Sequence, residues 1–316
     1  MINADKPHLW KKDIIASVDL FNDWFLKFAP VTYRKTRRNT VGMVTDAIKS
    51  TNDLLDITVD SIGANPGALQ ILRMTTAPPL ARDRLIGLSH CNKNLVIRME
   101  RKGELPVRMN ETELYKNLES ICKIVTELLD IDIFPWISLG KKPTDHERER
   151  ASTIIADRLC GAVTDPIIRN AQEQRQLNLI REYLETKSYT HVEHLSGTPL
   201  TDIPQGTFTF RMNVPAGDDL SINIPVDVVI QPKKLRTSKL PFLIEAKSAG
   251  DYTNVNKRRK EEATKIRQLK SAYGSEIQLI LFLCGYFDAG YLGYEASEEL
   301  DWIWEHRIDD FEKLGV

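Results

Sequence analysis

FLIEAKSAGDYTNVNKRRKEEATKIRQLK, residues 242–270, places an apolar strand directly before a long charged helix. We predict the strand at 240–247, the helix at 254–273 and a further apolar strand at 277–283. A helix between two strands implies a right-handed crossover, which makes the two strands parallel. This stretch therefore predicts an α/β fold.

Short segments rich in Val, Ile, Phe and Thr precede this stretch, and clusters of Gly, Pro and Asp separate them. They predict strands at 189–195, 207–214 and 222–230, with a helix before them at 167–185 and a helix after the last strand at 297–311. Together these elements form a mixed β-sheet core flanked by helices.

The first half of the chain has a helical period instead. Apolar residues recur every three or four positions at 13–28 and at 114–128. Thr144 and Glu147 have the spacing of a capping box at the start of a further helix. With 316 residues the chain is long enough for two domains, and we place the boundary near 165, between a mainly helical region at 1–165 and an α/β domain at 166–316.

Composition excludes several classes of protein. Apolar residues make up 42% of the chain and charged residues 28%, which excludes disordered and fibrous proteins. No apolar run approaches the roughly 18 residues of a membrane span, and the N-terminus lacks the apolar core of a signal peptide. The four cysteines are far apart and predict buried thiols in a reducing cytoplasm: Cys91, Cys122, Cys160 and Cys284.

Three ionisable residues lie within apolar strands, where a charge is costly unless it is paired or binds a metal. Asp227 lies in the strand IPVDVVI, and Glu245 and Lys247 end the strand FLIEAK on one face, with Ala246 on the other. Two carboxylates beside a lysine suit Mg²⁺ and phosphodiester hydrolysis, in which the lysine orients or deprotonates water or stabilises charge on the phosphate. The alternative is a structural ion pair at the end of the sheet.

Positive charge is concentrated around this site. Residues 231–270 contain twelve Lys and Arg against four acids, whereas the whole chain has a net charge of −1. Hydroxyl, amide and basic groups that can bind DNA phosphates follow the site directly: Thr253, Asn254, Asn256, Lys257, Arg258 and Lys260. A solvated helix is the alternative. Arg82 and Arg84 follow a proline-rich turn and can read guanine edges or bind phosphates, or remain surface charges.

Three segments carry a resemblance to a known family. DLFNDWFLKFAP at 19–30, MTTAPPLARDRLIGL at 74–88 and IEAKSAGDYTNVNKRRKEEATKIRQLK at 244–270 resemble the XamI-like type II restriction endonucleases of the PD-(D/E)xK nuclease superfamily. The resemblance implies that Asp227 and Glu245 hold Mg²⁺, with the Ala246 carbonyl as a further ligand, and that Lys247 assists the attacking water. The first motif is P-V-D here rather than P-D.

The resemblance implies a site-specific endonuclease that hydrolyses double-stranded DNA and leaves 5′-phosphates. Residues 1–165 would serve DNA recognition, dimerisation or both, and residues 166–316 catalysis. A homodimer is expected because one site cuts one strand, and a cognate DNA methyltransferase is implied because the host genome needs protection. The alternatives are a structure-specific repair or recombination nuclease and a DNA-binding protein without catalysis.

Nucleases of this superfamily often add a glutamate from the helix before the sheet. Glu173 and Glu182 are the candidates in the predicted helix at 167–185. A surface helix also carries glutamates simply because they stay solvated. The sequence does not choose between the two residues.

Overall fold

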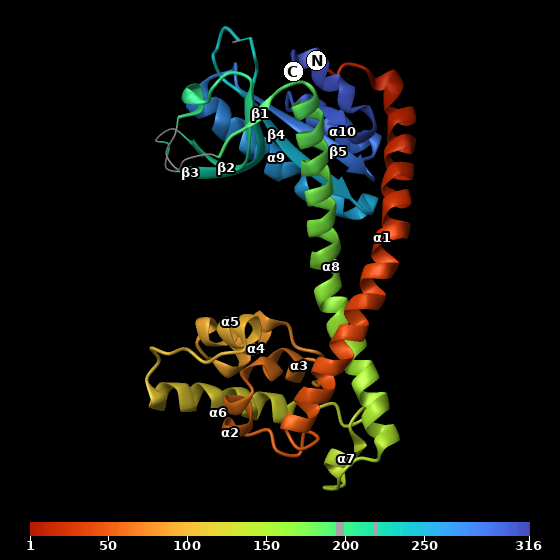
Figure 1. Cartoon of the computed structure of the whole chain (residues 1–316), viewed down its shortest axis with the longest axis vertical. Helices are drawn as coiled ribbons and strands as arrows, with labels where there is room; N and C mark the ends of the chain where they lie inside the picture. The colour runs from red at the N-terminus through yellow and green to blue at the C-terminus, as the bar shows by residue number, and fades with distance from the viewer. Residues whose placement is uncertain (194–198, 218–219, 221, 235) are drawn as a thin grey trace. The chain divides into compact units, whose positions relative to one another are not determined.

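The computed structural model describes the chain except residues 194–198, 218–219, 221 and 235 (Figure 1). The chain divides into two compact units, one of residues 1–28 with 168–316 and one of residues 29–167. Residues 1–28 therefore belong with the C-terminal half, a grouping that the sequence did not indicate. A helical N-terminal region followed by a mixed sheet with flanking helices confirms the predicted fold class.

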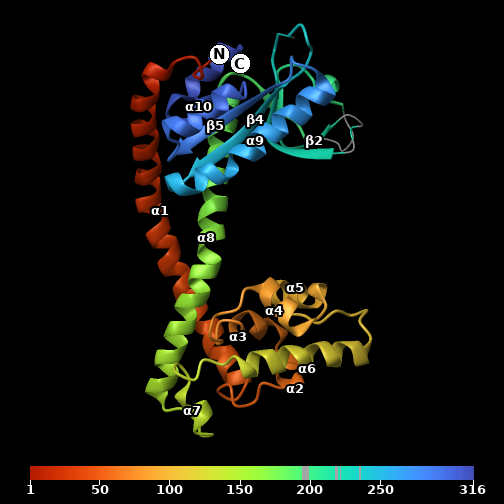
Figure 2. The same ribbon diagram turned by 180° about the vertical axis from the view of Figure 1, so that it is seen from behind.

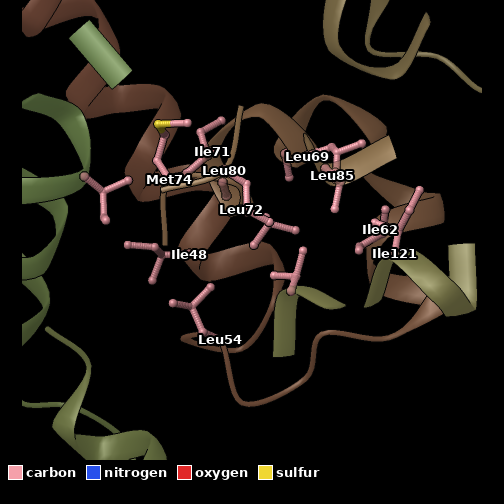
Figure 3. Packing of buried hydrophobic residues seen from close by; sticks show 14 of the residues in the cluster. Ile48, Leu54, Ile62, Leu69, Ile71, Leu72, Met74, Leu80, Leu85 and Ile121 are labelled. Atoms are coloured by element: carbon pink, nitrogen blue, oxygen red, sulfur yellow. The ribbon is translucent and has the colours of Figure 1, made fainter. Parts of the chain in front are cut away.

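The unit of residues 29–167 is helical. It holds parts of the long helices α1 (Pro7–Ser50) and α8 (Asp145–Thr186). Its shorter helices are α2 (Val59–Ala64), α3 (Leu69–Leu72), α4 (Arg82–Ser89), α5 (Lys93–Lys102), α6 (Glu111–Glu127), α7 (Pro135–Ser138) and the 3₁₀ turn η1 (Pro66–Ala68). Their apolar faces enclose one core, in which Ile48, Leu69 and Ile121 are fully buried (Figure 3).

The capping box predicted at the start of α8 is present. Glu147 N–H donates to Thr144 Oγ1 at 3.3 Å, and Thr144 N–H donates to Glu147 Oε2 at 2.7 Å. The helix then runs without a break through Asp165 and Pro166, where the sequence suggested a boundary.

The other unit contains a six-stranded sheet in the order β1-β2-β3-β4-β5-β6. The strands are β1 (Thr190–His191), β2 (Thr207–Ala216), β3 (Ile222–Gln231), β4 (Phe242–Ala249), β5 (Gln278–Gly285) and β6 (Asp301–Trp304). The pairs β2 with β3 and β3 with β4 are antiparallel, whereas β4 with β5 is parallel, as the predicted crossover through α9 (Tyr252–Tyr273) requires.

Helices cover the two faces of this sheet. Leu177, Ile180 and Leu184 of α8 pack on one face with Ile244 of β4, and Ile266 and Leu269 of α9 pack on the other face with Leu243. Figures 1 and 2 show α8 and α9 on opposite sides of the strands. Adjacent residues of β4 thus point towards different helices, which decides where the ionisable side chains of this strand lie.

The predicted C-terminal helix at 297–311 is wrong. The chain forms α10 (Ala289–Ser297), then strand β6, and ends in the 3₁₀ helix η3 (Glu305–Leu314). Trp302, Ile303 and Trp304 are fully buried, and β6 pairs in parallel with β5. A strand buried on both faces has no polar alternation to distinguish it from a helix, which explains the error.

Candidate active site

Asp227 lies where strands β3 and β4 separate. These strands pair only at Val228↔Ile244, Val229↔Leu243 and Ile230↔Phe242. Beyond the paired segment, the Ala246 N–H donates to Asp227 Oδ2 at 2.8 Å. The carboxylate therefore bridges the two strands at the point where their backbone ladder ends.

A kink in β2 directs Asp227 to this position. Arg211 has a left-handed φ of 53°, and it lies between the register pairs Phe210↔Val228 and Met212↔Val226. Val228 packs on the α8 side of the sheet, whereas Val226 packs on the α9 side, although regular strand alternation would put both on one face. The local change of face occurs at Asp227.

Glu245 and Lys247 project from β4 towards α9, and Ala246 packs towards α8, so the predicted alternation is confirmed. Lys247 Nζ lies 3.1 Å from Glu245 Oε1. The ion pair considered as the structural alternative therefore exists. It does not account for Glu245 Oε2, which is buried and accepts no hydrogen bond from any described residue.

Two residues of α9 complete the charged cluster, and the sequence interpretation missed both. Glu262 Oε1 lies 2.9 Å from Lys247 Nζ, and Lys265 Nζ lies 2.6 Å from Glu245 Oε1. A signal was present, because Glu262 precedes the buried Ile266 by four residues and Leu269 by seven and so falls on the buried face of the helix. A glutamate at such a position needs an explanation.

Burial and like charge raise the pKa of Asp227 from its ordinary value of 3.8 to about 6. Loss of solvent is the largest cause and the charge of Glu245 the next, while the bond from the Ala246 N–H opposes them. Burial alone would lower the pKa of Lys247, but Glu245 and Glu262 outweigh it and raise that pKa. Lys247 therefore carries its charge at neutral pH.

The structure distinguishes the two candidate glutamates of α8. The charge of Glu173 contributes to the raised pKa of Asp227, and its carboxylate accepts a bond of 3.0 Å from Arg211 at the kink of β2. Glu182 instead lines a groove with Trp24 and Phe28. Glu173 is thus the glutamate near the three predicted site residues.

The predicted DNA-contacting residues have different surroundings. Arg84 is exposed, whereas Arg82 Nε donates to Glu100 at 2.6 Å, and the side chain of Glu100 is only 1% exposed. Thr253 and Lys260 are exposed on α9. The side chains of Asn254, Asn256, Lys257 and Arg258 lie outside the described residues.

The donor set fits a hard divalent cation. Asp227 and Glu245 offer carboxylate oxygens, and the unpartnered Glu245 Oε2 is the clearest free ligand atom. A cation would also relieve the repulsion that raises the pKa of Asp227. In the described part of the chain, His, Cys, Asp and Glu form no group of three or more in metal-binding proximity.

Two acids and a lysine on separating strands of a mixed sheet are typical of metal-dependent DNA nucleases. The model of the XamI restriction endonuclease family matches residues 52–304, and the chain belongs to this family. It is also 56% identical to the type II restriction enzyme SalI of Streptomyces albus G over the full length of both proteins. No solved structure matches the chain.

The chain is therefore a type II restriction endonuclease that acts on DNA at specific sites. This confirms the predicted function over the repair nuclease and the non-catalytic DNA-binding protein. Enzymes of this type generally use a divalent metal ion.

All four cysteines are buried and free, as predicted, and no helix among the described residues has the length and apolarity of a membrane span.

The raised pKa of Asp227 predicts a pH-dependent effect of Asp227→Asn in metal-free buffer. The native state binds the proton of this carboxyl more tightly than the unfolded chain does, so this contribution to stability is complete below about pH 4 and lost as pH rises through about 6. The variant should gain about 1–2 kcal/mol in free energy of unfolding at pH 8 and nothing at pH 4.

Denaturant unfolding followed by tryptophan fluorescence would measure this difference. Asp19→Asn, at an exposed position of α1, is the control and should show no such pH dependence. A variant that is less stable than the wild type at pH 8 would contradict the described environment of Asp227.

Proposed function

We propose that the chain is a Mg²⁺-dependent nuclease of the PD-(D/E)xK superfamily that leaves 5′-phosphates. The observation that carries the proposal is the convergence of Asp227, Glu245 and Lys247 where β3 and β4 separate. Asp227, Glu245 and the Ala246 carbonyl would hold Mg²⁺, with water and phosphate oxygens as its other ligands. When bound, the ion would polarise the phosphate and lower the pKa of a water molecule.

Lys247 would act as a charged hydrogen-bond donor to oxygen rather than as a base. Its two carboxylate neighbours raise its pKa, so the ammonium group persists at the pH of the reaction. A fixed ammonium group can orient the attacking water and stabilise the charge that develops on the phosphate. The hydrogen bond from the Ala246 N–H holds the Asp227 carboxylate in place, so that it would face the same phosphate and water oxygens as Lys247.

Lys247→Ala should abolish cleavage without preventing DNA binding, because the substitution removes the positioned charge but leaves both acids. We expect a loss of at least about 10³-fold in the single-turnover cleavage constant with Mg²⁺. Affinity for the same duplex, measured with Ca²⁺ in place of Mg²⁺, should be retained.

Lys270→Ala is the matched control, because Lys270 lies on α9 and pairs with Glu299 outside the site. This variant should cleave at the wild-type rate. Wild-type cleavage by Lys247→Ala would refute the assignment of the site.

We infer that Arg84 contacts DNA directly, and that Thr253 and Lys260 of α9 do so as well. Asn254, Asn256, Lys257 and Arg258, whose side chains lie outside the described residues, are also proposed to contact DNA. Exposure of the first three residues supports the inference, since a side chain must reach the duplex. Arg82 is also proposed to contact DNA, but its hydrogen bond to the buried Glu100 side chain also stabilises the fold.

Arg82→Ala and Arg84→Ala should therefore differ. Arg82→Ala leaves the buried Glu100 with Arg73 as its remaining ion-pair partner among the described residues, and should reduce the free energy of unfolding by about 1–3 kcal/mol. Arg84→Ala should keep its stability. It should instead lower DNA affinity. If Arg84 contacts a phosphate, the slope of log affinity against log salt concentration should decrease in magnitude by about 1. If Arg84 contacts a guanine, discrimination between the cognate and a substituted base pair should fall by about 1–3 kcal/mol.

Thermal unfolding and DNA titrations at several salt concentrations test the two variants together. Equal loss of stability in both, or unchanged DNA affinity of Arg84→Ala, would contradict this division.

We propose that the active species is a homodimer, with a cognate DNA methyltransferase protecting the host genome. The chain has one set of Asp227, Glu245 and Lys247, whereas a duplex break requires two hydrolyses. A twofold dimer places one site on each strand of a palindromic sequence.

A mixture of wild-type and Lys247→Ala subunits tests the dimer. Mixed dimers have one active site, so supercoiled plasmid should accumulate as nicked circles. Independent monomers would instead give double-strand breaks at a rate reduced in proportion to the inactive fraction. Sedimentation of one subunit per cognate duplex would exclude the dimer.

A further inference from the structure

Glu262 is the most deeply buried member of the charged cluster. Glu262 is 0% exposed. It lies on α9 next to Ala263 and one turn before Ile266, which are both in the core. Its Oε1 forms an ion pair of 2.9 Å with Lys247 Nζ, and neither Oε1 nor Oε2, both buried, accepts a hydrogen bond of good geometry from any described residue. Among the described residues, Lys247 is the cation that this carboxylate contacts.

Stability does not explain a glutamate at this position. A buried carboxylate loses its hydration, and an ion pair with one ammonium group recovers only part of that free energy. An apolar side chain would continue the face formed by Ala263, Ile266 and Leu269 without this cost. The position therefore suggests a role in the chemistry of the site.

The contacts of Glu245 indicate what that role is. Glu245 Oε1 already lies within 3.1 Å of both Lys247 Nζ and Lys265 Nζ, and Glu245 is also a proposed ligand of the divalent cation. A carboxylate that binds a divalent cation is a weaker partner for an ammonium group. Glu262 is not among the proposed ligands, so its contact with Lys247 is independent of the cation.

We propose that Glu262 is a positioning residue that holds the Lys247 ammonium group at the reacting phosphate while Glu245 binds the cation. This inference rests on the proposed function, because it assumes the catalytic role of Lys247. Lysine has a flexible four-carbon side chain, and a second fixed carboxylate restricts where its Nζ can lie. Such restriction lowers the barrier of the chemical step without altering ground-state binding of DNA.

Glu262→Gln is the decisive variant. The amide has the same shape and still offers an oxygen to Lys247, and Glu245 remains as the charged partner of that lysine, so the fold should tolerate it. We expect the single-turnover cleavage constant to fall about 10- to 100-fold at saturating Mg²⁺, with unchanged affinity for DNA in Ca²⁺. Glu262→Asp keeps the charge but is one methylene shorter, and should recover part of the loss.

Calorimetric titration of the DNA complex with Ca²⁺ gives a readout that does not depend on cleavage. Glu262→Gln should bind the ion as the wild type does, whereas Glu245→Gln should bind it more weakly. A parallel loss of ion binding in both variants would make Glu262 a ligand and overturn the proposal. Equal cleavage constants for Glu262→Gln and Glu262→Asp would also overturn it, since charge would then be irrelevant.

Glu305→Gln is the matched control for general destabilisation. Glu305 is also buried and pairs with Arg175 of α8 at 2.6 Å, whereas the Lys247 side chain pairs with Glu262 of α9. The substitution Glu305→Gln should lower thermal stability without a comparable fall in the cleavage constant. If Lys247→Ala is inactive and Glu262→Gln cleaves like the wild type, only this proposal fails. If Lys247→Ala itself cleaves normally, the proposed function fails as well.

Discussion

The site depends on one constraint, the separation of β3 from β4 after three pairs of residues. An antiparallel pair that continued would engage the backbone groups of β4 in hydrogen bonds with β3. Separation leaves the Ala246 N–H free to donate to Asp227 Oδ2, while Glu245 and Lys247 project from β4 towards α9. The left-handed residue Arg211 supports this geometry, because it turns β2 and β3 at the level of Asp227.

Much of the fold could be predicted from local patterns. All five predicted strands and the helix between β4 and β5 are present, because turn residues bound their alternating or apolar runs. The first of them, predicted at 189–195, forms only the short β1, and its last two residues lie outside the described residues. β6 could not be distinguished from a helix, because Trp302, Ile303 and Trp304 are all buried. The grouping of residues 1–28 with the sheet was also hidden, since it depends on long-range contacts such as that from Asn3 to the Trp302 carbonyl.

The candidate site was predictable only where charge interrupts an apolar strand. Asp227, Glu245 and Lys247 stand out for that reason, whereas Glu262 and Lys265 lie in a helix where charged residues are common. Only their spacing from Ile266 and Leu269 indicates a buried face. The choice of Glu173 over Glu182 likewise needed the position of α8 on the sheet, which no periodicity of the helix itself supplies.

The net charge of the cluster without a metal ion differs in sign from its net charge with a divalent ion bound. With Asp227 ionised, three carboxylates (Asp227, Glu245 and Glu262) face the two ammonium groups of Lys247 and Lys265, which leaves one excess negative charge. Burial and, next, the charge of Glu245 raise the pKa of Asp227. The excess negative charge favours binding of a cation. A bound divalent ion would reverse the sign and leave one excess positive charge, which favours a phosphate group. Under the proposed function, the cluster would therefore repel the DNA backbone until the metal ion is present. The metal ion would bind first and the phosphate second, so the charge of the cluster would set the order in which the groups required for hydrolysis assemble.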